Sequence, residues 1–106
     1  MMAHILYTTK ARMKKKEPQK TIAELLKQID NQIFHIKKDH TGTMKLRQWL
    51  RLCYVSNQDF ARLLGVQRAT IQFYLNGIRK PSEETMDKIR DLTSGFVDQK
   101  EDLVDG

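Results

Sequence analysis

The sequence predicts an all-α protein, a compact bundle of four to five helices preceded by a further amphipathic helix. Apolar residues recur at spacings of three and four along most of residues 21–98, which is the pattern of helices that bury one face. Capping residues, glycines and a proline separate these stretches by short connections, as in small helical bundles. The 106 residues, 40% of them apolar, suffice for one small domain with an extension.

Composition divides the chain into four segments. We expect residues 1–20 to form a flexible basic arm, residues 21–40 an amphipathic helix, residues 44–98 the folded domain, and residues 99–106 a loose acidic tail. No apolar run approaches the ~20 residues of a membrane-spanning helix, so we expect no membrane partner. The order of apolar and basic residues in 1–16 argues against a secretory signal, whereas a mitochondrial presequence stays open.

Charge is distributed unevenly around the net value of +6. Residues 44–80 carry seven lysines and arginines against one acid, whereas residues 81–106 carry three against eight. A DNA duplex is a dense line of phosphates, and a protein that binds it presents a positive face. We therefore expect DNA contact from the central basic residues, while solvation of the surface is an equal alternative for the N-terminal lysines. The central residues concerned are Arg47, Arg51, Arg62, Arg68, Arg79 and Lys80.

The amphipathic segment 21–38 begins with a capping-box pattern, Thr21 followed three residues later by Glu24. Its apolar residues are spaced like a coiled-coil seam, and Thr41-Gly42 breaks the helix behind it. Two interpretations stay open: the seam docks onto the folded domain, or it binds a second copy of the chain or another protein. The seam consists of Ile22, Leu26, Ile29, Ile33 and Ile36, widened by Leu25 and Phe34.

Residues 44–53 form the next predicted helix, with Thr43 as its cap. Trp49 falls in register with the inner apolar residues, so we expect it in the core rather than stacked on a base. Cys53 is the single cysteine, which excludes an internal disulfide and a thiolate zinc site. Its place at the end of the apolar pattern predicts a buried structural thiol. The inner face consists of Leu46, Trp49, Leu50 and Cys53.

Two short helices, 57–64 and 68–75, are predicted on either side of a tight turn at Gly65, where glycine accepts positive φ at low cost. Apolar residues at i, i+3 and i+4 let the helices pack together, with the small Ala61 where they cross. The inner residues are Phe60, Leu63 and Leu64 in the first helix and Ile71, Tyr74 and Leu75 in the second. The outer residues of the second helix are Gln67, Arg68, Ala69, Gln72 and Phe73.

A last helix is predicted behind Pro81, which cannot continue the previous one, with Ser82 as its cap. Gly95 ends this helix, and Phe96-Val97 is expected to fold back as a short strand or an anchor. The same two residues are a second candidate for a dimer surface, beside the 21–38 helix. The inner residues of the last helix are Met86, Ile89 and Leu92.

Residues 44–98 resemble the Cro and phage-repressor type of helix-turn-helix domain, which has the lambda-repressor-like fold. One departure lies at Gln67, because the family usually has Ser or Thr at the cap of the recognition helix. The resemblance implies a small Cro-like regulator of bacterial or phage origin, cytoplasmic and associated with the nucleoid when bound to DNA. The motifs are Gln58-x-Phe60-Ala61-x-x-Leu64-Gly65-Val66, Thr70-Ile71-x-x-Tyr74-Leu75-x-Gly77-x-Arg79-x-Pro81 and Leu92-Thr93-Ser94-Gly95-x-Val97.

The outer residues of the 68–75 helix are the types that contact base edges in the major groove. Arg68 can take guanine O6 and N7 as a bidentate pair, and Gln67 or Gln72 can pair with adenine. Ala69 and Phe73 can pack on thymine methyl groups. Plain surface exposure is the alternative for Gln72 and Phe73.

Phosphate contacts are expected at both ends of the two-helix unit. In the resembled family, the glutamine that opens the first of the two helices meets a phosphate, and that residue is Gln58 here. Asn57 lies at the same helix end, where unpaired N–H groups attract phosphate. The basic segment Arg12 to Lys20 can add phosphate or minor-groove contacts. The full set expected at phosphates is Asn57, Gln58, Arg62, Thr70, Arg79 and Lys80.

Other chemistry finds little support in the sequence. His35 and Asp39 share one helix face beside His40, but a fourth ligand is missing, and we expect no metal. We find no Gly-rich phosphate loop, no nucleophile paired with a base and no paired carboxylates in an apolar setting. We therefore expect neither a cofactor nor an enzyme.

The sequence thus predicts a sequence-specific DNA-binding transcriptional regulator, a repressor that binds a two-fold symmetric operator in double-stranded DNA as a homodimer. One alternative is an antitoxin or accessory regulator whose N-terminal helix binds a protein partner. An exposed seam at Ile22, Leu26, Ile29 and Ile33 would favour it. Another alternative is an adaptor that binds protein rather than DNA, against which the basic cluster argues.

Overall fold

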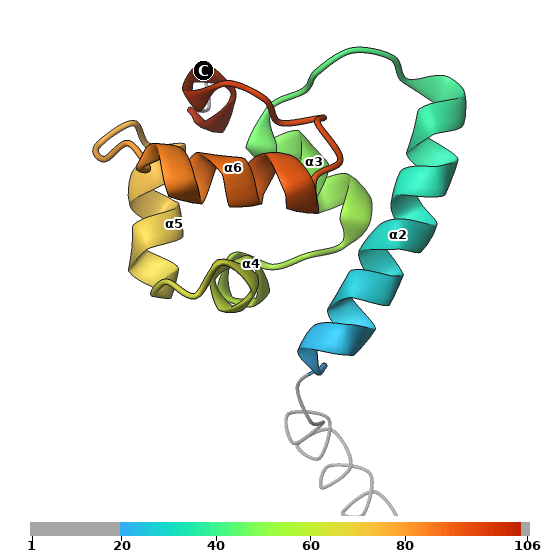
Figure 1. Ribbon diagram of the computed structural model, residues 1–106, viewed down its shortest axis with the longest axis horizontal. Helices are drawn as coiled ribbons and strands as arrows, with labels where there is room; N and C mark the ends of the chain where they lie inside the picture. The colour runs from blue at the N-terminus through green and yellow to red at the C-terminus, as the bar shows by residue number, and fades with distance from the viewer. Residues whose placement is uncertain (1–19, 105–106) are drawn as a thin grey trace, which may run out of the picture.

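The computed structural model describes residues 20–104, and all regular structure within that range is helical (Figure 1). The all-α class predicted from the sequence is therefore confirmed. Most of the predicted basic arm lies outside the described residues. Within the described range, no helix is both long and apolar enough to cross a membrane. The elements are α2 (Ile22–Asp39), α3 (Leu46–Cys53), α4 (Asn57–Leu64), α5 (Arg68–Leu75), α6 (Glu83–Leu92) and a short 3₁₀ helix, η2 (Lys100–Leu103).

Helix α2 starts at the capping box that the sequence predicts. The Thr21 hydroxyl accepts a hydrogen bond from the Glu24 N–H at 3.1 Å, and the Glu24 carboxylate accepts one from the Thr21 N–H at 2.8 Å. These two bonds satisfy backbone donors that a helix start leaves unpaired. The inward face of α2 is buried in the domain, which is the first of the two arrangements left open above. The buried residues are Leu25, Ile29, Ile33 and Ile36.

A glutamine ties α2 to the domain. The side-chain amide of Gln28 donates hydrogen bonds to the backbone carbonyls of Cys53 and Tyr54, at 2.8 and 2.9 Å. These carbonyls stand at the end of α3, where the last carbonyls of a helix have no partner within it. Tyr54 leaves the helix with φ of 59°, in the left-handed region. Gln28 therefore supplies a cap to a helix that ends without glycine.

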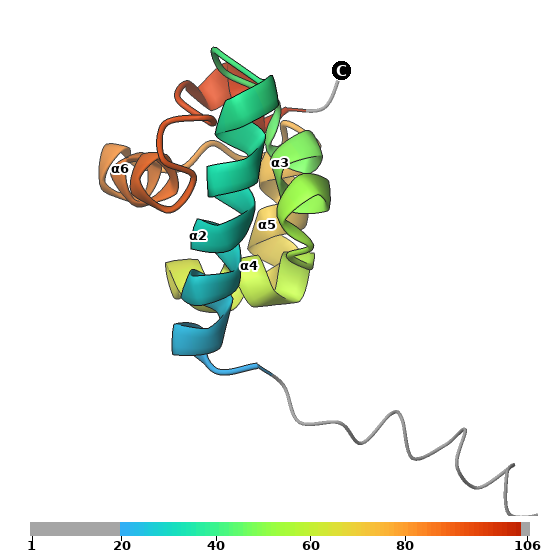
Figure 2. The ribbon, with the colours of Figure 1, turned by 90° about the vertical axis from the view of Figure 1, so that its right-hand side faces the viewer.

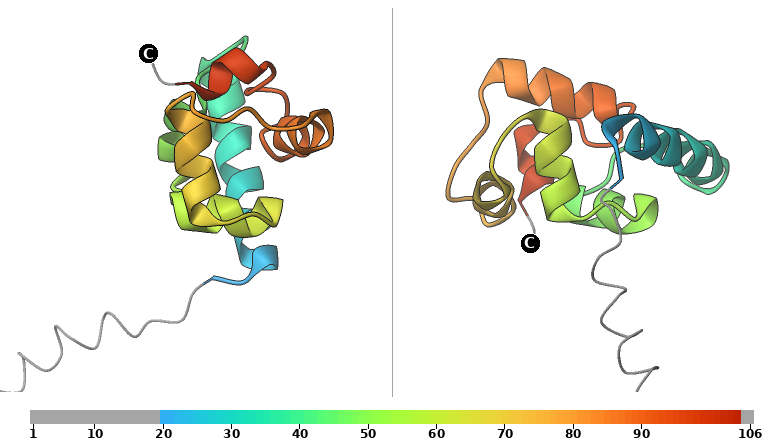
Figure 3. Two further views of the ribbon diagram at one scale, coloured as in Figure 1. Left: turned by 90° about the vertical axis from the view of Figure 1, so that its left-hand side faces the viewer. Right: turned by 90° about the horizontal axis from the view of Figure 1, so that it is seen from below.

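Helix α2 and helix α5 lie on opposite sides of the molecule. Figure 1 places α5 at the left edge and α2 at the right. The view from the right in Figure 2 has α2 in front, and the left panel of Figure 3 has α5 in front. Since both helices bury their apolar faces in one common core, their exposed faces point away from each other.

Two aromatic rings mark the centre of the core. Trp49 of α3 and Phe60 of α4 are fully buried, and their ring centroids lie 5.8 Å apart. The interpretation of Trp49 as a core residue is therefore confirmed. Cys53 is fully buried in the same core, and burial raises the pKa of its thiol to about 12. The prediction of an inert structural thiol agrees with this environment, because the thiolate is the reactive form.

The start of α3 differs from the prediction. Thr43 does not cap it, because the helix begins at Leu46 with Lys45 as its cap residue and no side-chain cap bond. The chain before it is extended instead, and the Met44 N–H donates to the Phe96 carbonyl at 2.7 Å. The side chain of Met44 is buried. Anchoring this side chain keeps residue 44 out of the helix.

The segment after α6 is an anchor and forms no strand. Phe96 and Val97 are buried in the core, so the expectation that they offer a dimer surface is wrong. Thr93 holds them in place. Its hydroxyl donates to the Ile89 carbonyl at 2.8 Å and accepts from the Val97 N–H at 3.2 Å. Phe96 and Val97 thus complete the core of a single chain.

The tail was expected to be loose, and this is wrong for its described part. The 3₁₀ helix η2 is capped at its start, where the Asp102 carboxylate accepts a hydrogen bond from the Gln99 N–H at 3.1 Å. The Leu103 side chain is buried in the core. Lys45 donates to the Glu101 carbonyl at 2.9 Å. The acidic composition hid one apolar residue, Leu103, whose burial outweighs the preference of its charged neighbours for water.

Candidate nucleic-acid interface

Helices α4 and α5 form the turn that the sequence predicts. Ser56 caps α4 by accepting a hydrogen bond from the Asp59 N–H at 3.1 Å. Gly65 follows α4 with φ of 76°, a left-handed conformation that glycine adopts without strain. Helix α5 starts at Arg68, and Gln67 in the cap position makes no side-chain cap bond. The departure from Ser or Thr at this position therefore leaves the start of α5 without a side-chain cap, while its bounds are those predicted.

Helix α5 buries one face and offers the other to solvent. Ile71, Tyr74 and Leu75 pack inward, as predicted. Gln67, one of the expected base contacts, is exposed at the start of the helix. An open hollow of about 320 Å³ lies on the outer face. The other four expected base contacts line this hollow: Arg68, Ala69, Gln72 and Phe73.

Two contacts hold side chains of the hollow. The Asn57 side-chain amide donates to the Gln72 side-chain oxygen at 3.3 Å, which joins the start of α4 to the outer face of α5. The Arg79 guanidinium lies over the Phe73 ring, 5.0 Å from its centroid. Asn57 and Arg79 were expected at phosphates. The structure places each of them beside an expected base contact.

The other expected phosphate contacts differ in their surroundings. Gln58 and Lys80 are exposed, the first in the opening turn of α4 and the second in the loop after α5. Thr70 is partly buried in α5. Arg62 is partly buried and pairs with the Asp59 carboxylate at 3.1 Å within α4. Asp59 is the one acid of residues 44–80. Because Arg62 pairs with it, Arg62 is the least available of the expected phosphate contacts for binding DNA.

The loop after α5 is fastened more firmly than the sequence indicates. The Phe73 carbonyl accepts from the N–H groups of Ile78 and Arg79, at 2.9 and 3.3 Å. Gly77 turns the chain with φ of 75°. A side chain on Gly77 would meet Val104 of the tail at 3.4 Å. Val104 of the tail therefore lies beside Gly77 in the loop that carries Arg79, a proximity that the sequence did not predict.

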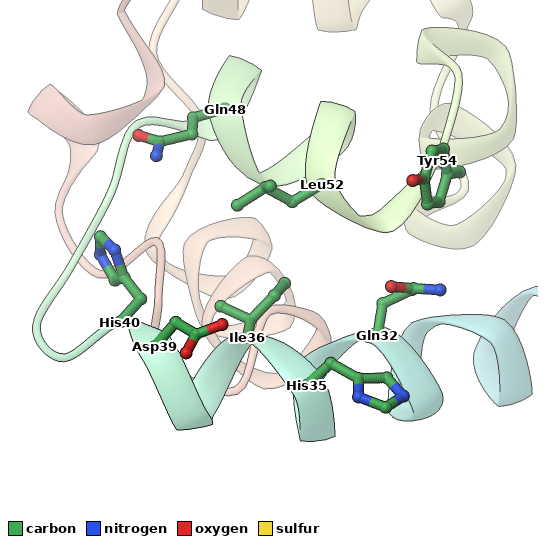
Figure 4. Close-up of a pocket in the computed structure, with 8 residues that line it drawn as sticks. All are labelled: Gln32, His35, Ile36, Asp39, His40, Gln48, Leu52 and Tyr54. Atoms are coloured by element: carbon green, nitrogen blue, oxygen red, sulfur yellow. The ribbon is translucent and has the colours of Figure 1, made fainter.

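A second hollow, of about 390 Å³, lies between α2 and α3 (Figure 4). Asp39, His35 of α2 and His40, the residue that follows α2, line it, but the rings of His35 and His40 point away from each other. Among residues 20–104, no three His, Cys, Asp or Glu side chains are placed to hold a metal ion. The remaining lining residues are Gln32, Ile36, Gln48, Leu52 and Tyr54.

The arrangement of α4 and α5, with a solvent-facing second helix of base-contacting residue types, defines the class of helix-turn-helix domains. Residues 46–93 match a family model described as helix-turn-helix. None of the curated proteins and none of the solved structures compared with the chain matches it.

The matched segment, α3 to Thr93, belongs to the Cro/repressor type of helix-turn-helix domains, as the sequence motifs predicted. This family is one of DNA-binding regulators and is not typically enzymatic. The match indicates the function of a DNA-binding transcriptional regulator for this segment. Helix α2 and the segment after Thr93 lie outside the match.

Proposed function

We propose that the protein is a repressor that inserts α5 into the major groove of a two-fold symmetric operator in bacterial or phage DNA. The observation that carries the proposal is the hollow on α5. Its four lining residues are all of types that contact base edges, and a buried apolar face behind them fixes the direction in which they point. A helix held in this way fits the groove with its outer face on the bases.

Base contacts are assigned by the chemistry of each side chain. Arg68, at the start of α5, pairs with guanine O6 and N7, and a bidentate contact of this kind discriminates by about 1–3 kcal/mol. Gln72 pairs with adenine, and Gln67 reaches a base at the edge of the site. Ala69 and Phe73 supply apolar surface.

Phosphate contacts flank the bases and set the position of α5 in the groove. Gln58 at the start of α4 and Lys80 behind α5 are exposed at the two ends of the unit. Asn57 and Arg79 lie next to them and join the phosphate contacts to the base contacts. We assign Thr70 and Arg62 lesser roles because both are partly buried.

A symmetric operator requires two copies, with one α5 in each half-site at a separation of about 34 Å. Phe96 and Val97 are buried, and α2 lies on the opposite side of the molecule from α5 (Figures 1–3). A two-fold contact through α2 would turn the two α5 helices in opposite directions. We therefore assign the exposed Ile22 and Leu26 of α2 no role in bringing two copies onto the half-sites.

Selection of bound fragments from a random DNA pool tests the proposal, followed by affinity measurements on the selected fragment at two salt concentrations. We expect an inverted repeat and a steep loss of affinity with salt, because each neutralised phosphate releases counterions. Fragments without a common sequence would reject sequence-specific regulation. A single asymmetric site would reject the two-fold operator.

A protein partner on α2 is the second candidate function, as in an antitoxin or accessory regulator. Of the seam residues that would favour it, Ile22 and Leu26 are half-exposed while Ile29 and Ile33 are buried. Phe34 adds an apolar ring that is 61% exposed. A toxin reading frame beside the gene, and a stable complex of the two purified products, would support this function over a homodimer on α2.

A further inference from the structure

The hollow on α5 has two kinds of wall. Ala69 and Phe73 lie one helical turn apart and contribute a methyl group and an aromatic ring, while Arg68 and Gln72 lie one turn apart beside them and contribute polar groups. An apolar pair is thus enclosed on one side by a guanidinium and an amide. The hollow is open to solvent and presents carbon surface where a base edge would arrive.

The walls are held by groups outside α5. The Phe73 ring lies under the Arg79 guanidinium, and the loop that carries Arg79 is fastened to the Phe73 carbonyl by two backbone hydrogen bonds. Gln72 accepts a hydrogen bond from Asn57 of α4. Phe73 and Gln72 are therefore already in contact with neighbouring groups in the free protein, which lowers the cost of ordering these two side chains when a ligand binds.

The floor of the major groove offers few apolar groups. Among the four bases, the C5-methyl group of thymine is the apolar group that projects into this groove, while the other exposed positions are mainly hydrogen-bond donors and acceptors. Cytosine methylated at C5 carries the same group at the same place. A hollow with carbon walls next to an arginine thus matches a methylated pyrimidine next to a guanine.

We propose, resting on the function proposed above, that this hollow receives the C5-methyl group of a pyrimidine next to the guanine that Arg68 binds. The determinant is the methyl group itself rather than the thymine–adenine pair. Phe73 and Ala69 contact the methyl group, and Asn57 and Arg79 are positioning residues that hold the walls. It follows that 5-methylcytosine serves as well as thymine at this position.

The test uses the full chain and the selected operator, with four bases placed in turn at each pyrimidine that adjoins a guanine. Thymine and 5-methylcytosine carry the methyl group, whereas uracil and cytosine lack it. At one position in each half-site we expect uracil and cytosine to weaken binding about three- to tenfold, the effect of burying one methyl group. We expect 5-methylcytosine to restore the affinity of thymine within about twofold.

Variants connect the effect to the hollow. In Phe73→Ala, the ratio of affinities for thymine and uracil should fall to about one, because the principal carbon wall is gone. Ile78→Ala is the matched control, since Ile78 is an apolar residue that is 69% exposed, lies five positions along the chain and does not line the hollow. Its ratio should equal that of the unchanged protein. The arm with modified DNA needs no variant, so poor folding of Phe73→Ala leaves the test intact.

Three results would overturn the inference. Equal affinity for all four bases at every position would refute the methyl contact and leave the proposed regulator function standing. Affinity for 5-methylcytosine as low as for cytosine would assign the preference to the base pair, and so to Gln72. Failure to select any common DNA sequence would reject the proposed function, and with it the inference.

Discussion

The molecule carries two solvent-exposed helices that differ in how they are held. The recognition surface consists of Asn57 and Gln58, the outer residues of α5, and Arg79 and Lys80. The α2 surface packs Leu25 and its neighbours into the core, and Gln28 ties it to the end of α3. On the recognition surface, Asn57 donates a hydrogen bond to Gln72 and Arg79 lies over the Phe73 ring. We therefore expect substitutions in the buried face of α2 to change stability and substitutions in the outer face of α5 to change affinity for DNA.

The largest expected effect is on the α2 surface. Leu25 is fully buried, and Leu25→Ala should lower the free energy of unfolding by about 2–5 kcal/mol, through lost burial and the cavity left behind. Urea denaturation followed by circular dichroism measures it. Leu26→Ala is the matched control, because the next residue loses the same atoms while 41% exposed. Equal losses in the two variants would show that α2 does not dock through its buried face.

Arg68→Ala addresses the recognition surface. We expect a loss of about 1–3 kcal/mol in operator binding and a relaxed preference at one base pair per half-site, because a bidentate guanine contact disappears. The unfolding midpoint should stay unchanged, since Arg68 is exposed. Fluorescence anisotropy with operators altered one base pair at a time measures the preference. Unchanged specificity would remove Arg68 from the set of base contacts.

The pH dependence of stability reports on the core between the two surfaces. The folded pKa of Cys53 is about 12, above its ordinary value of 9.0, because burial disfavours the thiolate. This group's stabilising contribution is complete below pH 9 and is lost as the pH rises towards 12, at about 1.4 kcal/mol per pH unit. The free energy of unfolding, measured by urea denaturation from pH 8 to 10.5, should therefore fall more steeply with pH for the natural chain than for Cys53→Ala. Parallel curves would contradict the burial of the thiol.

Gln28→Ala probes the tie between α2 and α3. The variant loses two hydrogen bonds to carbonyls at the end of α3, and we expect it to lower stability by about 1–2 kcal/mol. Lys27→Ala is the control, as an exposed neighbour on the same helix. Thermal unfolding compares the two. If both variants match the natural chain, water replaces the Gln28 amide and the tie contributes nothing.

Periodicity predicted the elements whose apolar residues face one core. Apolar spacing together with the turn at Gly65 and the end at Asn76-Gly77 placed α4 and α5 at their observed bounds, because glycine accepts positive φ at low cost. It also listed seam residues of α2 that the domain buries, among them Ile29 and Ile33. The seam could not be assigned to docking or dimerisation beforehand, because an amphipathic helix has the same pattern whichever apolar surface covers it.

What the sequence did not predict depends on single long-range contacts. Leu103 is one apolar residue in an acidic stretch, and no local rule indicates that it reaches the core. Met44 leaves the expected helix because it pairs with Phe96, fifty-two positions away. At the recognition surface, the sequence predicted the residue types. It could not predict the hydrogen bond from Asn57 to Gln72, because that bond depends on how the turn orients α4 and α5.

Lys80→Ala should have the smallest effect and gives the sharpest contrast between the two surfaces. Lys80 is exposed behind α5. Loss of a phosphate contact there should lower the affinity for all DNA sequences alike. The slope of log affinity against log salt should shrink by about 0.9, one released counterion. Lys37→Ala removes the same charge from α2, on the opposite side of the molecule (Figure 1), and the slope should stay as it was. Equal slopes in the two variants would mean that net charge, rather than a contact at position 80, attracts the DNA.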